Sequence, residues 1–325
     1  MRKLVLSALV LALVVIMLGA YTRLTDAGLG CPDWPGCYGF LSVPKQDHHI
    51  AQAQEAFPER PLEAHKAWNE MIHRYFAGTL GLVILVIALL SLKKTVAPRP
   101  LKLPLFLLLL VIFQAALGMW TVTMNLMPLV VMGHLLGGFS ILACLFLLYL
   151  RLTPYRIPGG DIRLRRFCRF ALVGVFILVG QIALGGWVSA NYAALACTEL
   201  PLCQTGWSDR LDFAGAFSLV EANSYEFGTH DYDERMTMHI VHRIGALITF
   251  AYLAWLALRL YSTAAAPLLR NLSVLLLVVL TTQVSLGVAN VLFSLPLAVA
   301  VAHNAVAALL LLVLVMINYS LFRKI

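Results

Sequence analysis

The sequence predicts an all-α integral membrane protein in which eight transmembrane helices form two tandem, pseudo-symmetric four-helix bundles. Composition is the first of two observations behind this fold class. Of the 325 residues, 61% are hydrophobic and 12% are charged, and the mean hydropathy is +0.85, whereas about 25% of the residues of a soluble domain are charged. The second observation is an internal repeat, which indicates that one four-helix unit occurs twice.

The repeat relates polar residues of the two halves at one fixed offset. The matched residues are His73-Arg74 with His242-Arg243, Gln114 with Gln283, and His134 with His303. In every pair the sequence numbers differ by 169, as 242 minus 73 shows. A tandem duplication explains the constant offset, and each half then carries two histidines within apolar sequence.

Eight apolar runs are long enough to cross a membrane. A hydrocarbon core of about 30 Å requires about 20 helical residues, and lipid offers free backbone amides no partner, which favours helices. In order, the runs are 4–22, 69–92, 103–123, 130–150, 170–190, 238–260, 272–292 and 298–320. The first run could instead be a signal peptide, but Leu18-Gly19-Ala20-Tyr21 resembles Leu184-Gly185-Gly186-Trp187, which favours a retained helix.

The net charge of +8 orients the protein and does not indicate a nucleic-acid partner. Lys and Arg concentrate at the termini and near 93–102 and 151–169, whereas every acidic residue except Asp161 falls on the opposite side. This positive-inside pattern predicts that both termini are cytoplasmic. The chain is then an N-terminal half (1–150), a basic cytoplasmic linker (151–169) and a C-terminal half (170–325). Four helices in each half give parallel repeats related by an axis along the membrane normal.

Two long outer loops follow the first helix of each half, at about 23–67 and 191–236. Long loops opposite the basic face are expected to cap a site there, although tolerated insertion is the alternative. The polar loop histidines are expected in solvent and receive no role; they are His48, His49, His65 and His230. The stretch 204–235 and its function are left unassigned.

Each outer loop contains two cysteines with five residues between them. The pairs are Cys31 with Cys37 and Cys197 with Cys203. Because both pairs lie on the oxidising side, a disulfide in each loop is the leading interpretation. Zinc binding is less favoured, since the spacing is not C-x2-C. A redox-active role for the first pair is a further alternative to structural stapling.

The four repeated histidines predict two haem sites. His73, His134, His242 and His303 each lie in the outer third of an expected helix, among apolar residues and glycines. A lone histidine there could donate a hydrogen bond to a neighbouring helix. Two matched pairs at similar depth favour neutral imidazoles as axial ligands of haem iron, and adjacent glycines allow a flat macrocycle to approach the backbone.

Further polar residues accompany these histidines. Arg74 and Arg243 are candidates for pairing with haem propionates in bidentate geometry, the alternative being arginines that extend to the interface. Gln114 and Gln283 occur in the pattern Gln-x-x-Leu-Gly, which Gln181 repeats. Hydrogen bonding between helices is the favoured role of these amides.

One position distinguishes the two halves. Glu70 stands three residues before His73, whereas His239 stands three residues before His242. This spacing puts each residue on the same helix face as its histidine. A carboxylate at a membrane boundary can accept a proton or stabilise developing positive charge; a salt bridge to Arg74 or Lys66 is the alternative. We therefore expect chemistry in the first half and electron transfer or stability from the haem of the second.

The segment Thr22-Arg23-Leu24-Thr25-x-x-Gly28-Leu29-x-x-x-x-Trp34, together with Glu70-x-x-His73-Arg74, resembles the haem A synthase family. His134, His242-Arg243 and His303 complete the likeness, which covers nearly the whole chain. The paired loop cysteines are similar to those of the bacterial members that carry them.

The resemblance implies a reaction and a role for each site residue. Family members oxidise the C8 methyl of haem O to a formyl group through a hydroxymethyl intermediate, haem I, with oxygen taken from water. By this likeness His73 and His134 bind the substrate haem, and His242 and His303 ligate a haem b cofactor. Glu70 matches the essential glutamate. Cys31, Cys37, Cys197 and Cys203 match the family cysteines.

The resemblance also implies a setting, the bacterial cytoplasmic (inner) membrane, with haem sites toward the outer face. Expected partners are haem O, haem O synthase, membrane lipid and an electron acceptor that the sequence does not identify, with homo-oligomers also allowed. Two other functions stay open at this point. A diheme b-type cytochrome would pass electrons without modifying haem, and a transporter would bind none.

Overall fold

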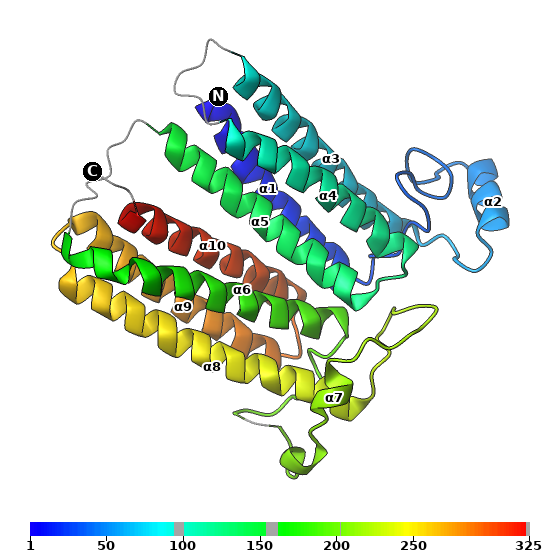
Figure 1. Ribbon diagram of the computed structural model, residues 1–325. Helices are drawn as coiled ribbons and strands as arrows, with labels where there is room; N and C mark the ends of the chain where they lie inside the picture. The colour runs from blue at the N-terminus through cyan, green and yellow to red at the C-terminus, as the bar shows by residue number, and fades with distance from the viewer. Residues whose placement is uncertain (94–100, 154–161, 202, 323–325) are drawn as a thin grey trace. The chain divides into compact units, whose positions relative to one another are not determined.

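The computed structural model describes residues 1–93, 101–153, 162–201 and 203–322, and within them it confirms the predicted fold class. Eight helices of the described chain are long and apolar enough to cross a membrane (Figure 1). They are α1 (Arg2–Leu24), α3 (Ala64–Leu92), α4 (Lys102–Thr123), α5 (Pro128–Leu152), α6 (Cys168–Ala190), α8 (Tyr232–Thr263), α9 (Pro267–Leu292) and α10 (Leu297–Phe322). The β-structure of the described residues is one isolated bridge, between Cys37 and Phe40.

Several helices extend beyond the apolar runs that predict them. α3 begins at Ala64 instead of residue 69, and α8 begins at Tyr232 instead of residue 238. The start of α8 has a physical cause in a capping box: the Asp231 side chain accepts from the Glu234 amide, and the Glu234 side chain accepts from the Asp231 amide. Two backbone donors at the helix start are thereby satisfied. The Asp-x-x-Glu pattern could have located this boundary.

His230 corrects one expectation. Its side chain is buried and its Nδ1 lies 2.9 Å from Glu234 Oε2, although a solvent-exposed loop histidine was predicted. The Glu234 carboxylate, which accepts from the Asp231 amide in the capping box, therefore also contacts the side chain of the residue before Asp231.

Shorter elements occupy the outer loops and one linker. They are α2 (Asp47–Ala56), α7 (Phe213–Ala216) and the 3-10 helices η1 (Ile162–Phe167) and η2 (Trp207–Arg210). The central part of the linker 151–169 lies outside the described residues, as do some residues that carry the charge asymmetry: Lys94, Arg99, Arg156, Asp161, Arg323 and Lys324.

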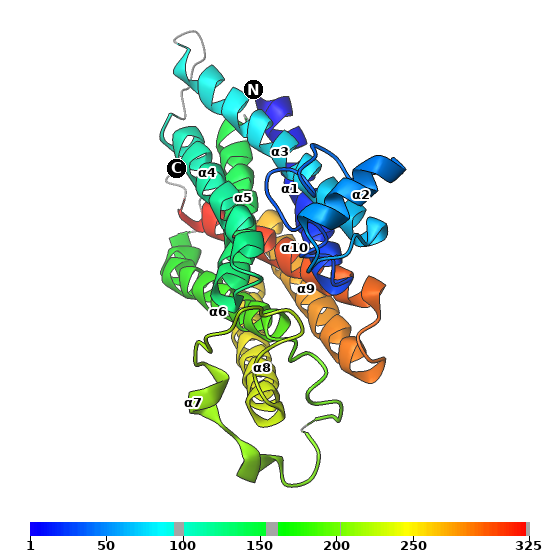
Figure 2. The same ribbon diagram turned by 90° about the vertical axis from the view of Figure 1, so that its right-hand side faces the viewer.

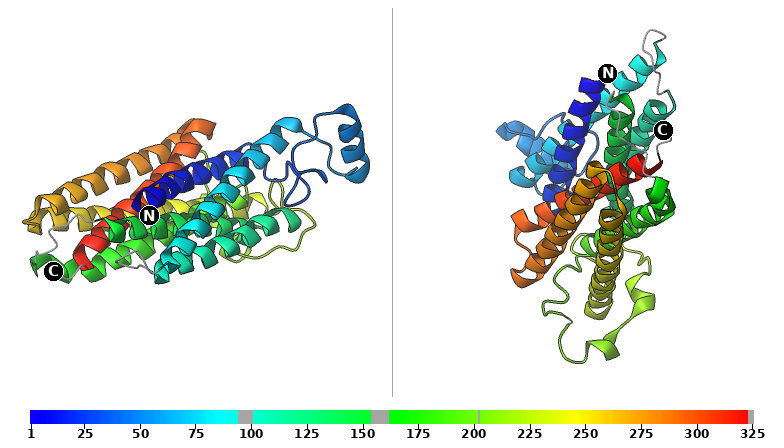
Figure 3. Two further views of the ribbon diagram at one scale, coloured as in Figure 1. Left: turned by 90° about the horizontal axis from the view of Figure 1, so that it is seen from above. Right: turned by 90° about the vertical axis from the view of Figure 1, so that its left-hand side faces the viewer.

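The chain divides into two compact units. The first comprises residues 3–142 with 220–229, and the second comprises 143–219 with 230–325. In the second unit α8 packs against α6 and α9, and α10 packs against the same two helices, as the views in Figures 2 and 3 show. These contacts close a ring in the order α6, α8, α9, α10.

The helices of the first unit form a ring in the corresponding order, α1, α3, α4, α5. Thr22 of α1 donates to the Asn69 carbonyl of α3, α3 packs against α4, and Gln114 of α4 bonds to His134 of α5. Gly138 of α5 faces Ile16 of α1 and closes the ring. The predicted halves, 1–150 and 170–325, stay a prediction about how the chain is organised.

The turns of the two units repeat each other in backbone conformation. Asn125-Leu126 between α4 and α5 has positive φ at both residues, and so does Ser294-Leu295 between α9 and α10. The sequence numbers again differ by 169. In both turns the leucine amide donates to a carbonyl five residues earlier, at 2.8 Å and 2.7 Å. Since leucine rarely adopts this conformation, its occurrence twice is backbone evidence for the duplication.

A segment of the second outer loop belongs to the first unit. The Tyr225 amide donates to the Asn125 carbonyl at 3.0 Å, the Asn125 side chain donates to the Asn223 carbonyl at 2.9 Å, and Arg60 pairs with Glu226 at 3.3 Å. The Tyr225 side chain also packs against a buried apolar cluster of that unit, which comprises Leu29, Val122 and Leu126. Part of the unassigned stretch 204–235 thus covers the turn between α4 and α5 and contacts Arg60 and Leu29 of the first loop.

Tyr225→Ala should loosen this cover without unfolding the protein. Losing the apolar contact is expected to cost about 1.4 kcal/mol of local opening free energy, which is roughly a tenfold larger open population. Limited proteolysis within 220–229 should accelerate by the same factor, while the thermal midpoint changes little. Leu219→Ala, at an exposed position of the same loop, is the control; equal cleavage rates in the two variants would contradict the assignment.

Candidate functional site

Each unit places its two repeat histidines on helices that face each other across the ring. His73 lies on α3 and His134 on α5, which are separated by α1 and α4. His242 on α8 and His303 on α10 are likewise separated by α6 and α9. A duplicated ring of four helices therefore creates two interior sites, each with one imidazole from either side.

The spacing of the first pair fits an iron atom between two imidazoles. The ring centroids of His73 and His134 are 6.4 Å apart and the ring planes meet at 77°. Two metal–nitrogen bonds of about 2 Å, lengthened by the two ring radii, give roughly 6 Å between centroids. The side chains thus stand at a separation that bis-histidine ligation would require.

A glycine on a neighbouring helix lies against each of the four imidazoles. A Cβ at Gly19 would be 3.0 Å from Cε1 of His73, and one at Gly118 would be 3.2 Å from Cε1 of His134. The corresponding distances are 3.1 Å for Gly185 with His242 and for Gly287 with His303. Because these separations are shorter than ordinary carbon contacts, glycine lets each ring pack directly on a helix backbone.

One histidine of each unit has a buried ring nitrogen with no hydrogen-bond partner in the described chain. Among the described residues, Nδ1 of His73 and Nδ1 of His303 are buried without a hydrogen-bond partner. The amide nitrogens of Gln114 and Gln181 lie 3.1 Å and 3.0 Å from Nδ1 of His134 and His242. A buried, unpaired imidazole nitrogen is costly. The donor set therefore fits haem iron in both units.

Glu70 is buried and held by charged and backbone donors. Its exposed fraction is 5%, Oε2 accepts from the Cys31 amide at 2.8 Å, and Oε1 pairs with the guanidinium of Arg74. Charge-assisted bonds of this kind fix the orientation of a carboxylate. The salt bridge that the sequence left as an alternative is formed, and it is made with Arg74; Lys66 pairs with Glu63 instead.

At the matching position of the second unit, His239 is buried as well. Its Nδ1 has no hydrogen-bond partner within the described chain, and the ring faces the backbone carbonyl of Ala193. The two units therefore differ in charge beside the first histidine, since one holds a carboxylate and the other an imidazole.

The arginine after each first histidine clamps the adjacent disulfide loop. Arg74 donates to the carbonyls of Asp33, at 2.9 Å, and of Pro35 and Gly36. Arg243 donates in the same way to the carbonyls of Glu199 at 2.7 Å and Pro201 at 3.5 Å.

The second guanidinium nitrogen of the arginine has a different partner in each unit. In Arg74 it bonds to Glu70, whereas in Arg243 it donates to the Cys197 carbonyl at 2.6 Å. Nε of Arg243 is buried and unpaired among the described residues, so one donor could still serve a propionate. Propionate binding by either arginine stays a prediction.

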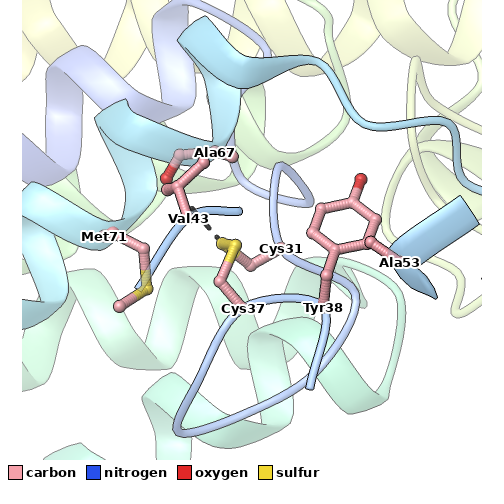
Figure 4. Close-up of a cluster of buried hydrophobic side chains, with 7 residues drawn as sticks. All are labelled: Cys31, Cys37, Tyr38, Val43, Ala53, Ala67 and Met71. Carbon is pink, nitrogen blue, oxygen red and sulfur yellow. Dashed lines mark hydrogen bonds between the residues drawn. A yellow bond between two sulfur atoms is a disulfide. The ribbon is translucent and has the colours of Figure 1, made fainter. Parts of the chain in front are cut away.

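Both predicted disulfides are formed, Cys31–Cys37 and Cys197–Cys203. Bonded sulfurs are not thiolate ligands, so zinc binding by these cysteines does not fit this structure. Each disulfide is buried on the first turns of the helix that carries a histidine. The first cluster comprises Cys31, Cys37, Tyr38, Val43, Ala53, Ala67 and Met71 (Figure 4). The second comprises Cys197, Cys203, Met236 and Ile240.

The first disulfide loop is further ordered by Asp33, which sequence reasoning did not single out. Its carboxylate accepts from the amides of Tyr38 at 2.6 Å and Gly39 at 2.8 Å. Both of these residues have positive φ, as a tight two-residue turn requires. Burial raises the pKa of the Tyr38 phenol, which donates to the Pro61 carbonyl.

The glutamines contact the histidines themselves, which goes beyond the expected role of joining helices. Gln114 Nε2 lies 2.7 Å from the His134 carbonyl as well as near its ring, and Gln181 makes the same two contacts with His242. Gln283 Nε2 lies 3.3 Å from Nε2 of His303. A signal for this arrangement was present in the sequence, because each glutamine precedes its ring-contacting glycine by four residues.

Known proteins match this chain over nearly its whole length. The family model for cytochrome oxidase assembly protein, COX15-CtaA, matches residues 2–315. A protein of Shewanella oneidensis named heme A synthase is 58% identical over 97% of this chain and 95% of its own length. Proteins of the same name from Nitrosospira multiformis and Agrobacterium fabrum are each 29% identical, over 98% and 91% of this chain and 91% and 83% of their own lengths.

Gly185→Ala should weaken haem binding in the second unit, because the new Cβ would displace the imidazole of His242. Disturbing the support of a metal ligand typically costs about 10- to 100-fold in affinity. The measurement is haem retained per chain during gel filtration in detergent. Gly180→Ala is the matched control on the same helix, since a Cβ there meets open space. Equal retention by the two variants would refute the packing role of Gly185.

Proposed function

We propose that this chain, which belongs to the cytochrome oxidase assembly protein (COX15-CtaA) family, synthesises haem A by oxidising the C8 methyl of haem O to a formyl group. The observation that carries the proposal is the first unit itself, where His73 and His134 stand at iron-binding separation and Glu70 lies one helical turn from His73. The relatives named heme A synthase support the substrate and the product.

The two units have different roles in this proposal. His73 and His134 hold the iron of haem O, the substrate. His242 and His303 hold haem b, which supplies one-electron chemistry when bound. The single carboxylate difference supports this assignment, because a carboxylate is useful where positive charge or a proton must be accommodated, and Glu70 has His239 as its counterpart.

The reaction requires water and an electron acceptor. Conversion of the methyl to a hydroxymethyl group takes one oxygen atom from water and releases two electrons and two protons. A second round gives a gem-diol, which loses water to leave the formyl group. The electrons pass to an acceptor outside this chain.

Glu70 is the group in the first unit best suited to the proton steps. Electron removal from the methyl develops positive charge at that carbon, and a nearby carboxylate can stabilise the charge or take the proton. The Cys31 amide and Arg74 keep the carboxylate in one orientation. The disulfide loop and its arginine clamp therefore contribute to catalysis by positioning Glu70, and an electron-transfer role of Cys31–Cys37 is not required.

The chain is a multi-pass membrane protein. We further propose that it lies in the bacterial cytoplasmic membrane with both termini inside and both haem sites toward the outer face. Haem O reaches it from haem O synthase, and homo-oligomers are compatible with this arrangement. The apolar composition of the helices supports entry of a farnesylated haem from lipid.

Mass analysis of extracted haems tests the proposal against a diheme b-type cytochrome. Cells that express the chain with a haem O synthase should contain a farnesylated formyl haem or its hydroxymethyl precursor, and cells without the chain should accumulate haem O. His242→Ala should lose haem b while His73 and His134 still bind haem O. Haem b alone in the purified protein would instead identify an electron carrier.

Glu70→Gln should abolish haem A formation while preserving the structure. The amide oxygen can still accept from the Cys31 amide, so the loop remains in place, but the charge that serves the reaction is gone. Loss of a general base typically lowers the rate by about 100- to 10,000-fold. Haem A per bound haem is the measurement, and Glu63→Gln, an exposed carboxylate before the same helix, is the control. Unchanged haem A in Glu70→Gln would remove Glu70 from the mechanism.

A further inference from the structure

The first disulfide loop presents an apolar surface of its own. The exposed residues of the stretch 33–42 are Trp34, Pro35, Gly39 and Leu41, and we call these four residues the tip. Leu41 is 88% exposed and Trp34 is 42% exposed. Exposed apolar side chains that gather on one surface mark a place where a partner protein or a membrane is contacted.

The tip carries no charge. No charged residue occurs between Asp33 and Lys45, and both oxygens of the Asp33 carboxylate accept from amides of the loop itself. The inner side of the loop is buried against α3 through Cys31, Cys37 and Met71 (Figure 4). The outward face of the loop is therefore both apolar and uncharged.

The loop lies beside the part of α3 that meets the membrane boundary. A hydrocarbon core needs about 20 helical residues, and counting back from Leu92 places the boundary in the turn that carries Arg74. Arg74 donates to the Asp33 carbonyl at 2.9 Å, and the Tyr75 hydroxyl donates to the Leu41 carbonyl at 3.1 Å. Because side chains of a helix lean toward its N-terminus, these two bonds hold the tip level with the boundary.

The surface of α3 beside the tip is apolar and exposed as well. Ile72, Tyr75 and Phe76 are between 37% and 44% exposed. The next charged residue after the tip is Lys45, whose Nζ lies 4.7 Å from the centroid of the Trp68 ring. Trp68 precedes Tyr75 by seven residues, or about 10 Å along the helix. Aromatic rings at the boundary and a cation beyond them are typical of a membrane interface, so the tip continues the lipid-facing surface of α3.

The second disulfide loop does not repeat this surface, although the equivalent arginine holds it. Arg243 donates to the carbonyls of Glu199 and Pro201, as Arg74 does in the first loop. Among the described residues of 197–203, the exposed ones include Thr198 and Glu199. Since an ionised carboxylate is costly in lipid, the place beside the helix does not by itself require an apolar loop.

We propose that the tip of the first disulfide loop is inserted into the lipid leaflet around the loop end of α3. Trp34 and Leu41 contact acyl chains there, and Lys45 stays among the headgroups. Insertion removes apolar side chains from water and anchors the loop whose Cys31 amide bonds to Glu70. The inference concerns an interaction surface and does not depend on the proposed function.

Collisions of a spin label with oxygen and with a neutral nickel chelate test the proposal. Oxygen concentrates in lipid, the chelate stays in water, and a label covered by protein meets neither. Cys144→Ser and Cys168→Ser remove the free cysteines, Leu41→Cys carries the label, and one chain per lipid nanodisc excludes a second copy. Leu82→Cys, at a 65% exposed position of α3, gives the value for lipid, and Gln54→Cys, at an exposed position of α2, gives the value for water.

The ratio of oxygen to chelate collisions at residue 41 should lie closer to that of Leu82→Cys than to that of Gln54→Cys. Leu200→Cys in the second disulfide loop is the matched control and should behave like Gln54→Cys. A water-like ratio at residue 41, or few collisions with either reagent, would overturn the proposal. Lipid-like ratios at both residues 41 and 200 would contradict the assignment of insertion to the apolar tip.

Trp34→Phe provides a second measurement that adds no cysteine. The fluorescence that this variant loses, relative to the unmodified chain, is the emission of Trp34 alone. Brominated lipid should quench that emission, and iodide in the buffer should leave it unchanged. Quenching by iodide and not by brominated lipid would place Trp34 in water and refute insertion.

Discussion

Lipid provides no hydrogen-bond partner, so each polar side chain inside these helices must be satisfied by another helix or by a ligand. The interior of both four-helix rings follows from this constraint. Glutamines reach across to histidines, glycines bring the imidazoles onto neighbouring backbones, and one ring nitrogen in each unit has no protein partner. Haem iron with two axial imidazoles, as we propose, would remove the remaining cost.

Outside the helices, the loops are likewise ordered by hydrogen bonds that satisfy their polar groups. In each unit an arginine next to a proposed ligand donates to the carbonyls of a disulfide loop, and the disulfide packs on the first turns of the same helix. Hydrogen bonds and apolar contacts therefore join the loop, the arginine and the histidine helix in each unit. In the first unit the assembly also includes Glu70, whose carboxylate is bonded to the loop and to the arginine.

Duplication followed by local change accounts for the difference between the units. The ring order of the helices, the positive-φ turns and the arginine clamps are repeated. Two positions break the repeat close to His73: Glu70 replaces an imidazole, and Val15 replaces an amide. Both changes fall on the unit that we propose binds the substrate, and Glu70 supplies a carboxylate where the proposed chemistry needs one.

The sequence by itself determined the eight spans, the repeat, the pairing of the cysteines and the candidate ligands, because hydropathy, a constant offset and oxidising loops are local or periodic signals. Tertiary structure alone decided that Glu70 bonds to the Cys31 amide and that residues 220–229 belong to the first unit. These contacts join segments far apart in the chain. Their partners are chosen by which backbone groups remain unsatisfied once the helices have packed, and no local pattern encodes that choice.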